Sequence, residues 1–412
     1  MLKRRQSDFV DEYYTNNDLS ILKKLTLVIP TYNRNYYLSR CLWYHAHFPF
    51  GQIIVADSSP EEKKIVNRET VAKVREAFGT NILYIEYEPE TEKYGGDIYR
   101  KWGDAVQHVT TEYSQIVTDK EFSVPLGVID AIQYLDTHPD YAAADARNYF
   151  LVKSEKRNEN VYIFRQRRHD RHSETDEKTF NRFIDSFVTT QPAVNNCLIP
   201  SVMRSEIRKD VSTQISPDKV NDIRLGELVL AFFGHFHGKY RQNSEFISLV
   251  RDVSVISSQN IKQRWNSPES STTRYPTMED LIKTENTKFF DAFRTSLSSH
   301  LTEYANMSKD EAIQFVNKNY QDKYFIRYYL EKPSLIGFIA NNFPFVKSLW
   351  DISPAWMRKL GSKISLSIFN HPLSSKPIHD NEKYDNAELN IIKKVVENTI
   401  NLHDTDKPIE IC

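Results

Sequence analysis

The sequence predicts an α/β fold with a mostly parallel sheet and helices on both of its faces. Two observations lead to this prediction. Short apolar runs that suit buried strands alternate with longer segments whose apolar residues recur at helical spacing. The apolar runs also end in polar or turn-forming residues, as buried parallel strands do. The chain has 412 residues, of which 40% are hydrophobic and 26% charged, so it is long enough for two domains with a sizeable core.

The first part of the chain supplies most of the sheet. The apolar run that opens Leu25–Arg34 ends in a Pro-containing turn, and Gly95-Gly96 opens a segment with a clear helical period. In chain order, the sequence predicts a strand in Leu25–Arg34, a helix at Tyr36–Ala46, a strand at Gln52–Ala56, a helix at Ile65–Phe78, a strand at Asn81–Tyr87, a helix at Gly95–Val109, a strand at Ser114–Val117 and a helix at Leu126–Leu135.

The remaining elements are more widely spaced. We expect a strand within Ala142–Val152, a charged hairpin at Lys153–Glu177, a helix at Asp222–Phe233 and a last strand at Phe246–Arg251. The next residues are rich in Ser, Thr, Asn and Pro, which is typical of a linker. The predicted organisation is an extension at 1–23, an α/β domain at 24–253, a linker at 254–277 and a mainly helical region at 278–412.

Bulk composition excludes several classes of protein. The net charge of −1 gives no reason to expect nucleic acid as a partner. Cys41, Cys197 and Cys412 are too few and too scattered for a disulfide framework or a zinc site, which favours a reducing cytosol. The first residues are basic and then acidic without an apolar stretch, so we do not expect a signal peptide. The sequence has no run of ~18 apolar residues, so we do not expect a spanning helix. The expected location is cytoplasmic.

Polar residues collect where the predicted strands end, and open α/β sheets bind ligands at that edge. The first strand ends in Pro30-Thr31-Tyr32-Asn33-Arg34, the second in Asp57-Ser58-Ser59-Pro60 and the fourth in Asp119-Lys120-Glu121-Phe122. The first run alone would also suit another α/β fold, so its interpretation depends on the other two.

LTLVIPTYNR resembles the opening strand of glycosyltransferase family 2, whose members have the GT-A fold. The series Lys101–Ala105, Thr111-Glu112-Tyr113 and the acidic group is similar to a bacterial subfamily with the pattern K-x-x-x-A, T-E-Y and D-D-D-F. The resemblance spans Lys24–Asp252. It implies a GT-A domain that transfers a sugar, with inversion, from a nucleotide-activated donor.

The resemblance also implies a donor site. The residues that it places there are Pro30, Thr31, Tyr32, Arg34, Asp57, Lys101, Asp119, Lys120 and Arg251. Val55–Ser59 is similar to the family's V-D-D-x-S stretch, with Ala56 in place of the first acid. Asp57 could instead cap the following helix, and Arg251 could be an edge arginine paired with Asp252 or with solvent.

A divalent cation is expected with the donor. The resemblance implies that Asp119 and Glu121 hold Mg²⁺ or Mn²⁺ on the diphosphate, because hard carboxylate oxygens suit these ions. Lys120 stands where the subfamily has its middle acid. It either supplies positive charge itself or weakens the metal site.

The candidate residues for the general base and for the acceptor site lie in later segments of the chain. Arg224-Leu225-Gly226-Glu227-Leu228 resembles the family position of the general base, which implies that role for Glu227, with Asp222 as the rival. An exposed acid favoured by the helix dipole is the alternative. Asn195, Asn196, Arg165 and Arg168 are candidates on the acceptor side, although the basic cluster at 165–172 equally suits a solvated hairpin tip. His235 and His237 lie two apart on a helix, hence on different faces, which disfavours a metal site there.

The C-terminal segment 334–369 mixes aromatic and basic residues. A helical subdomain explains it best, and peripheral contact with the inner face of a membrane is the alternative. The predicted function is an inverting glycosyltransferase that acts on a glycan or lipid-linked acceptor, in building a bacterial surface polysaccharide. The rival functions are a nucleotidyltransferase acting on sugar phosphates, which usually has a Gly-rich loop that Thr31–Arg34 lacks, and a non-catalytic glycan-binding or scaffold protein with a degenerate GT-A site.

Overall fold

The structure is a computed structural model, and the chain divides into two compact units. One unit comprises Met1–Tyr275 together with Pro377–Cys412, and the other comprises Pro276–Lys376. The residues that the structure describes are 14, 18–89, 95–156, 159–166, 173, 175–179, 181, 198–214, 229–230, 233–252, 287–318 and 386–399.

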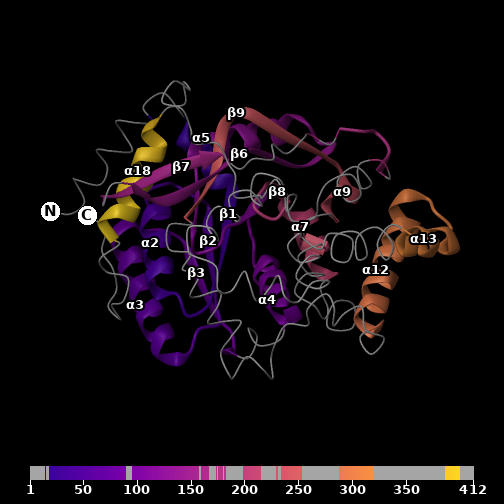
Figure 1. Ribbon diagram of the computed structural model, residues 1–412, viewed down its shortest axis with the longest axis horizontal. Coiled ribbons are helices and arrows are strands. Elements are labelled where there is room, and N and C mark those ends of the chain that lie inside the picture. The colour runs from indigo at the N-terminus through magenta and orange to yellow at the C-terminus, as the bar shows by residue number, and fades with distance from the viewer. Residues whose placement is uncertain are drawn as a thin grey trace, which may run out of the picture. The chain divides into compact units, whose positions relative to one another are not determined.

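The first unit is built on one large sheet, and half of this sheet is parallel. The strands of this half are β1 (Leu25–Thr31), β2 (Gln52–Asp57), β3 (Ile82–Glu86) and β4 (Tyr113–Ile116). Their spatial order is β3-β2-β1-β4, and Figure 1 labels the first three of them side by side. Every pairing among them is parallel. Both β1 and β2 are buried along their whole length, which explains their nearly continuous apolar sequences.

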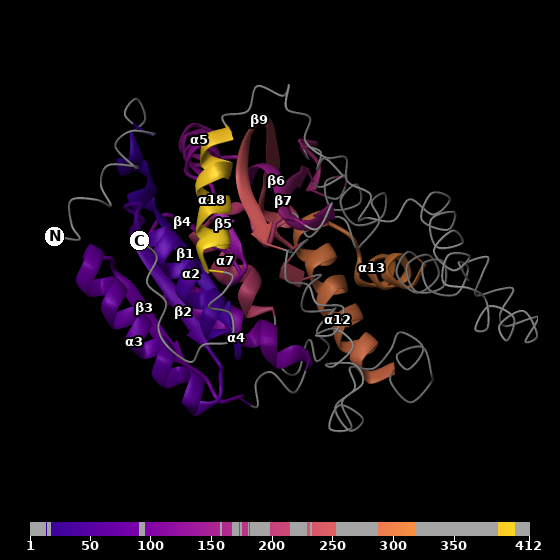
Figure 2. The same cartoon turned by 60° about the vertical axis from the view of Figure 1, so that its left-hand side comes forward.

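Helices cover both faces of this half because its crossovers change direction. The chain steps from β1 to β2 to β3 through α2 (Asn35–Ala46) and α3 (Glu61–Phe78), and then returns past β1 to β4 through α4 (Gly95–Gln107). Parallel crossovers are right-handed, so the reversal places α4 on the face opposite to α2 and α3. The helices α2 and α3 pack together, whereas α4 contacts β1 and β2 from the other side (Figure 2).

The other half of the sheet is mixed. It continues from β4 through β8 (Val202–Arg204), β6 (Tyr141–Lys156) and β9 (Lys239–Asp252) to β5 (Glu121–Ser123), and β7 (Glu159–Gln166) pairs with β6 as a hairpin. Here β6 and β9 are parallel, and the other pairings are antiparallel. Only residues 117–120 connect β4 to β5, so β5 lies close to β4 although it stands at the end of the strand order. The sheet is therefore curled (Figure 2).

The fold class predicted from the sequence is confirmed, and most element bounds differ by a few residues. The helix predicted at Ile65–Phe78 begins four residues earlier, and α5 (Pro125–Thr137) extends the predicted helix at both ends. The hairpin begins before Lys153, since β6 is a long strand that pairs with β7 through its second half. The other short elements are η2 (Leu19–Lys24), α7 (Ser205–Thr213) and α9 (Gly234–His237). Most of the predicted helix at 222–233 lies outside the described residues.

The helix α18 (Asn386–Thr399) belongs to the first unit, which the predicted C-terminal region at 278–412 did not anticipate. Leu389, Ile392 and Val396 lie on one face of this helix and join the core of the sheet unit. Glu388 fixes the helix, because its Oε1 accepts hydrogen bonds from the Tyr14 hydroxyl at 2.8 Å and the Leu126 N–H at 3.3 Å. Figures 1 and 2 show α18 running beside α2.

The described part of the second unit consists of two helices, α12 (Thr287–Ala305) and α13 (Lys309–Val316), which pack against each other. A capping box starts α13: the Ser308 hydroxyl accepts from the Glu311 N–H, and the Glu311 carboxylate accepts from the Ser308 N–H. The segment 334–369 lies outside the described residues. Among the described helices, none has the length and apolar character needed to cross a bilayer.

A buried histidine in α2 makes the stability of the first unit depend on pH. His45 Nδ1 donates to the Cys41 carbonyl at 2.8 Å, and Nε2 accepts from the Ser123 N–H at 3.0 Å, so the ring is neutral. Burial lowers the pKa of His45 to about 3. Its folded-state pKa lies below the unfolded value of about 6.5, so this stability is fully present above pH ~6.5 and is lost as the pH falls toward 3.

We expect His45 alone to reduce the free energy of unfolding by about 2 kcal/mol between pH 7 and 5. Urea unfolding followed by tryptophan fluorescence at several pH values measures this change. The matched variant is His45→Gln, which keeps one donor and one acceptor but does not titrate. Its pH dependence should be flatter over this window, and equal slopes in the two proteins would refute the assignment.

Candidate active site

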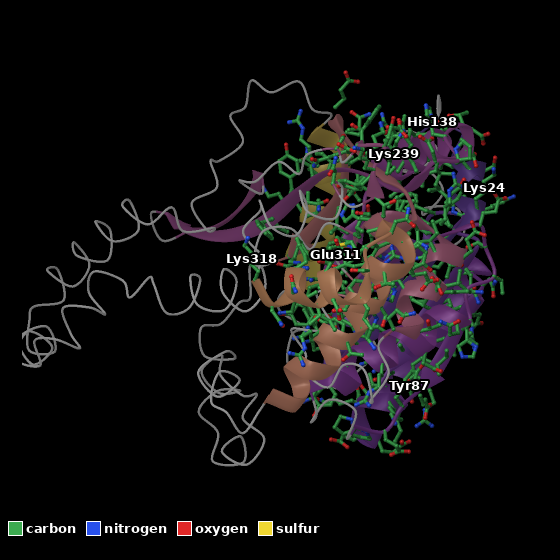
Figure 3. All side chains as sticks on the ribbon, turned by 90° about the vertical axis from the view of Figure 1, so that its right-hand side faces the viewer. Lys24, Tyr87, His138, Lys239, Glu311 and Lys318 are labelled. Carbon is green, nitrogen blue, oxygen red and sulfur yellow. The ribbon has the colours of Figure 1, made fainter. Side chains whose placement is uncertain are left out.

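The strands β1 and β4 stop pairing before their carboxyl ends, and polar side chains gather there. We call this place the crevice, after the position at which open α/β sheets bind ligands. The pairing of β1 with β4 stops at Val28, whereas β1 pairs with β2 as far as Thr31. Pro30, which has no N–H to donate, lies in the part of β1 that has no partner on the β4 side. Lys24, just before β1, and Tyr87, just after β3, mark the two opposite edges of the parallel half (Figure 3). The crevice lies at the carboxyl edge, where the strand order reverses.

An unusual backbone conformation starts the turn from β1 into α2. Asn33 has a φ of 52°, in the left-handed region that asparagine tolerates better than most residues. Its N–H donates to the Ser59 hydroxyl at 2.8 Å, which ties the turn to the segment after β2. The turn therefore places Tyr32, half-buried, and Arg34 next to the crevice.

Three of the predicted donor-site residues meet in the crevice. The Thr31 hydroxyl donates to Asp119 Oδ2 at 2.9 Å, and Arg34 Nη1 donates to Asp119 Oδ1 at 3.2 Å. The side chain of Asp119 is only 1% exposed, whereas that of Arg34 is 37% exposed. The carboxylate thus holds a guanidinium group that solvent, or a ligand in the crevice, reaches.

The acidic group after β4 forms a tight turn. The Glu121 N–H donates to the Thr118 carbonyl at 2.8 Å, which places Asp119 and Lys120 at the tip of the turn. Glu121 Oε2 accepts from the Thr118 N–H at 2.8 Å, and Oε1 accepts from Arg251 Nε at 2.5 Å. The predicted edge arginine therefore has an acidic partner, but this partner is Glu121 on the neighbouring strand and not Asp252.

Lys120 lies over an aromatic ring of α2. Its Nζ is 4.4 Å from the centroid of the Tyr37 ring, and the Arg40 guanidinium lies 5.1 Å from the same centroid. Arg40 is fully buried and donates to Asp252 Oδ2 at 2.6 Å. The Asp252 N–H in turn donates to the Lys120 carbonyl at 2.8 Å. The position of Lys120 is thus set from both its backbone and its side chain.

Asp57 is part of a buried network. Its Oδ1 accepts from the Ser59 N–H at 2.7 Å, and its Oδ2 accepts from Asn67 Nδ2 at 2.7 Å and from the Tyr84 hydroxyl at 2.5 Å. Burial and the Asp57 charge raise the pKa of Tyr84 well above its usual range. These contacts join the turn after β2 to α3 and β3. Contact with a base or ribose stays a prediction for Asp57, and a ligand at Oδ2 would have to displace Tyr84 or Asn67.

Lys101 reaches the crevice from α4. Its Nζ donates to the Thr31 carbonyl at 3.2 Å and to the Ser58 hydroxyl at 2.7 Å, and the side chain is buried. It therefore connects the ends of β1 and β2 from the face covered by α4. Its predicted contact with the donor remains a prediction.

The carboxylates do not form an open metal site. Each of the four oxygens of Asp119 and Glu121 accepts a hydrogen bond from Thr31, Arg34, Thr118 or Arg251. Among the described residues, no three His, Cys, Asp or Glu side chains are grouped so that they could hold a metal ion. The donor set here does not fit the Mg²⁺ or Mn²⁺ site expected from the resemblance.

The remaining candidates are placed only in part. Glu227, Asp222, Asn195, Asn196 and Arg168 lie outside the described residues. Arg165 lies in β7, where its backbone pairs with Phe150 of β6. His235 is buried, and His237 Nε2 lies 3.3 Å from Asp210 Oδ2, so the two histidines have different surroundings.

The sequence did not predict the buried residues that hold the turn at Lys120 in place. Arg40 and Tyr37 lie on a helix that is buried along its whole length. A charged residue between Leu38 and Leu42 on such a helix indicates a buried ion pair, and this signal could have singled out Arg40. Its partner Asp252 and the Tyr84–Asp57 contact depend on the spatial order of the strands, and no local pattern shows them.

No protein-family model matches the chain, and no curated protein matches it in sequence. Solved structures of TarS from S. aureus are similar in part. A structure of TarS 1–349 in complex with UDP is 15% identical, with a TM-score of 0.42, and covers 73% of this chain and 72% of that one. A complex of TarS 1–349 with UDP-GlcNAc is 15% identical, with a TM-score of 0.37, and covers 72% and 91%. At this level of similarity, function has to be inferred from the topology and the side chains of the chain itself.

Proposed function

We propose that the protein is an inverting glycosyltransferase whose nucleotide-sugar donor binds in the crevice between β1 and β4. The observation that supports this proposal most is that Thr31 and Arg34 both donate hydrogen bonds to Asp119 at the point where the strand order reverses. Open α/β sheets bind nucleotides in this place. The resemblance of the same segments to glycosyltransferase family 2 supports the sugar-transfer chemistry.

The reaction has one bond-forming and one bond-breaking event at the anomeric carbon of the sugar. An acceptor hydroxyl attacks this carbon from the face opposite to the nucleotide, and its proton passes to Glu227. The bond from the anomeric carbon to the phosphate oxygen breaks, and its electron pair leaves with the nucleoside diphosphate. Arg34, exposed beside Asp119, and Arg251, exposed beside Glu121, are suited to stabilise the negative charge that develops there.

The acceptor is proposed to be a glycan or a lipid-linked sugar of a bacterial surface polysaccharide. Asn195, Asn196, Arg165 and Arg168 are the candidates to bind it. This part of the proposal is supported by the resemblance and by the position of these residues in the chain, between the donor segments and Glu227.

The proposal is tested by nucleotide binding. We expect one of UDP, GDP, CMP and dTDP to raise the melting temperature of the protein, since a ligand at 100 times its Kd stabilises the folded state by about 2.7 kcal/mol. Asp119→Asn should weaken that nucleotide about tenfold, because the neutral amide no longer holds Arg34 with a charged hydrogen bond.

The control variant is Asp136→Asn, which changes an acid bonded to Lys24 and Tyr113 at the opposite edge of the sheet. It should leave nucleotide affinity unchanged. If none of the four nucleotides binds, the protein is not a nucleotide-sugar transferase. If one binds equally well to Asp119→Asn, its site lies elsewhere.

A further inference from the structure

We propose that Lys120 takes the place of a divalent cation at the donor's diphosphate, so that nucleotide binding does not depend on a metal. The inference rests on the proposed function and names the group that meets the diphosphate. It is drawn from four observations about the turn between β4 and β5.

The first observation is that the acidic side chains are already bound by the protein. Asp119 pairs with Arg34, and Glu121 pairs with Arg251. A cation bridging these carboxylates to a diphosphate would compete with both arginines for the same oxygens. In the described part of the chain, no third acid or histidine is grouped with them to complete its coordination.

The second observation is the position of Lys120. It lies at the tip of the turn, between the two acids whose pairing was just described. In the subfamily pattern, this middle position is acidic. A lysine here carries its own ammonium group to the place where the acids would otherwise hold an ion, and an ammonium group is a good partner for phosphate oxygens.

The third observation is that Lys120 is held in place. Its ammonium lies against the Tyr37 ring, and its carbonyl accepts from Asp252, which the buried Arg40 fixes. A surface lysine in a turn of mixed charge needs no such support. Preorganisation of this kind lowers the entropy that a flexible side chain loses on binding an anion.

The fourth observation is the balance of charge. Three cationic side chains (Arg34, Lys120 and Arg251) face two carboxylates (Asp119 and Glu121), and the buried Arg40–Asp252 pair is neutral as a whole. This group of side chains therefore carries an excess of positive charge. The binding of an anion would relieve this, whereas a divalent cation would add to the repulsion.

The test measures the binding of UDP, GDP and dTDP by calorimetry in excess EDTA, and again in excess Mg²⁺ or Mn²⁺. We expect the bound nucleotide to have nearly the same affinity in all three conditions. Lys120→Met should weaken it about tenfold or more in EDTA, as expected for the loss of a charge-assisted contact. Lys73→Met, on the exposed side of α3, is the matched control and should leave the affinity unchanged.

The variant Lys120→Asp gives an independent readout. It restores the acid of the subfamily pattern, so binding should become weak in EDTA and recover when Mn²⁺ or Mg²⁺ is added. Circular dichroism checks that each variant is folded.

Three results would overturn the inference. Binding of wild type that requires a metal would refute it and leave the proposed function intact. Metal-free binding that Lys120→Met does not weaken would refute the role of Lys120. If no nucleotide binds under any condition, the proposed function fails together with the inference.

Discussion

Replacing Glu227 with glutamine is expected to reduce turnover by ~10²–10⁴-fold, the contribution typical of a general base. Glutamine keeps the shape and most of the hydrogen-bonding capacity of glutamate, but it does not accept the acceptor's proton. Donor binding should stay nearly intact, because the proposed donor residues belong to the crevice between β1 and β4. Turnover is measured as release of the nucleoside diphosphate in the presence of acceptor.

Asp222→Asn is the matched control for this prediction. Asp222 lies five residues before Glu227, and its replacement should reduce turnover much less. The assignment is reversed if Glu227→Gln turns over almost normally and Asp222→Asn is inactive. Calorimetry with the nucleotide separates loss of chemistry from loss of binding, since only the latter changes the Kd.

The second large effect is on stability and concerns the buried pair of Arg40 and Asp252. Both side chains are fully buried. Arg40→Met removes the guanidinium and leaves the Asp252 carboxylate without its cation, which should cost about 3–5 kcal/mol of unfolding free energy. Urea unfolding measures the loss.

The double variant Arg40→Met/Asp252→Leu shows where that loss comes from. Nε and Nη1 of Arg40 are buried without a hydrogen-bond partner in the described part of the chain, so the pair itself is imperfectly compensated. Replacing both charges with apolar groups should therefore recover most of the lost stability. If the double variant is as unstable as the single one, the cost comes from lost packing around Tyr36, Tyr37 and Phe122 and not from the buried charge left without its partner.

Most of the parallel half of the sheet could be predicted from the sequence because three of its four strands, β1, β2 and β4, are buried along their whole length. The runs of β1 and β2 are almost continuously apolar and end in polar turn residues, so local composition locates them. The signal for β4 is weaker, because two of its four residues, Ser114 and Gln115, are polar although buried. Long, partly exposed strands such as β6 and β9 have no such simple signature. Their charged residues alternate with apolar ones, and β6 was therefore predicted too short.

The sequence predicted which residues form the candidate site, but not all of the contacts among them. Thr31, Arg34 and Asp119 were identified from the segments that follow β1 and β4, and the structure brings them into contact. The pairing of Glu121 with Arg251 depends on β5 lying next to β9, 130 residues away in the chain. The return of α18 to the first unit likewise depends on distant contacts of Glu388 with Tyr14 and Leu126.

Amide hydrogen exchange, with and without the nucleotide that binds, is the sharpest test of a nucleotide site at the carboxyl edge between β1 and β4. We expect slower exchange in the segments at 30–35 and 117–121, which carry Thr31, Arg34, Asp119 and Lys120. Exchange at the opposite edge, around Lys24 and Asp136, should not change. Protection confined to any other part of the chain, with both crevice segments unaffected, would show that the nucleotide binds elsewhere.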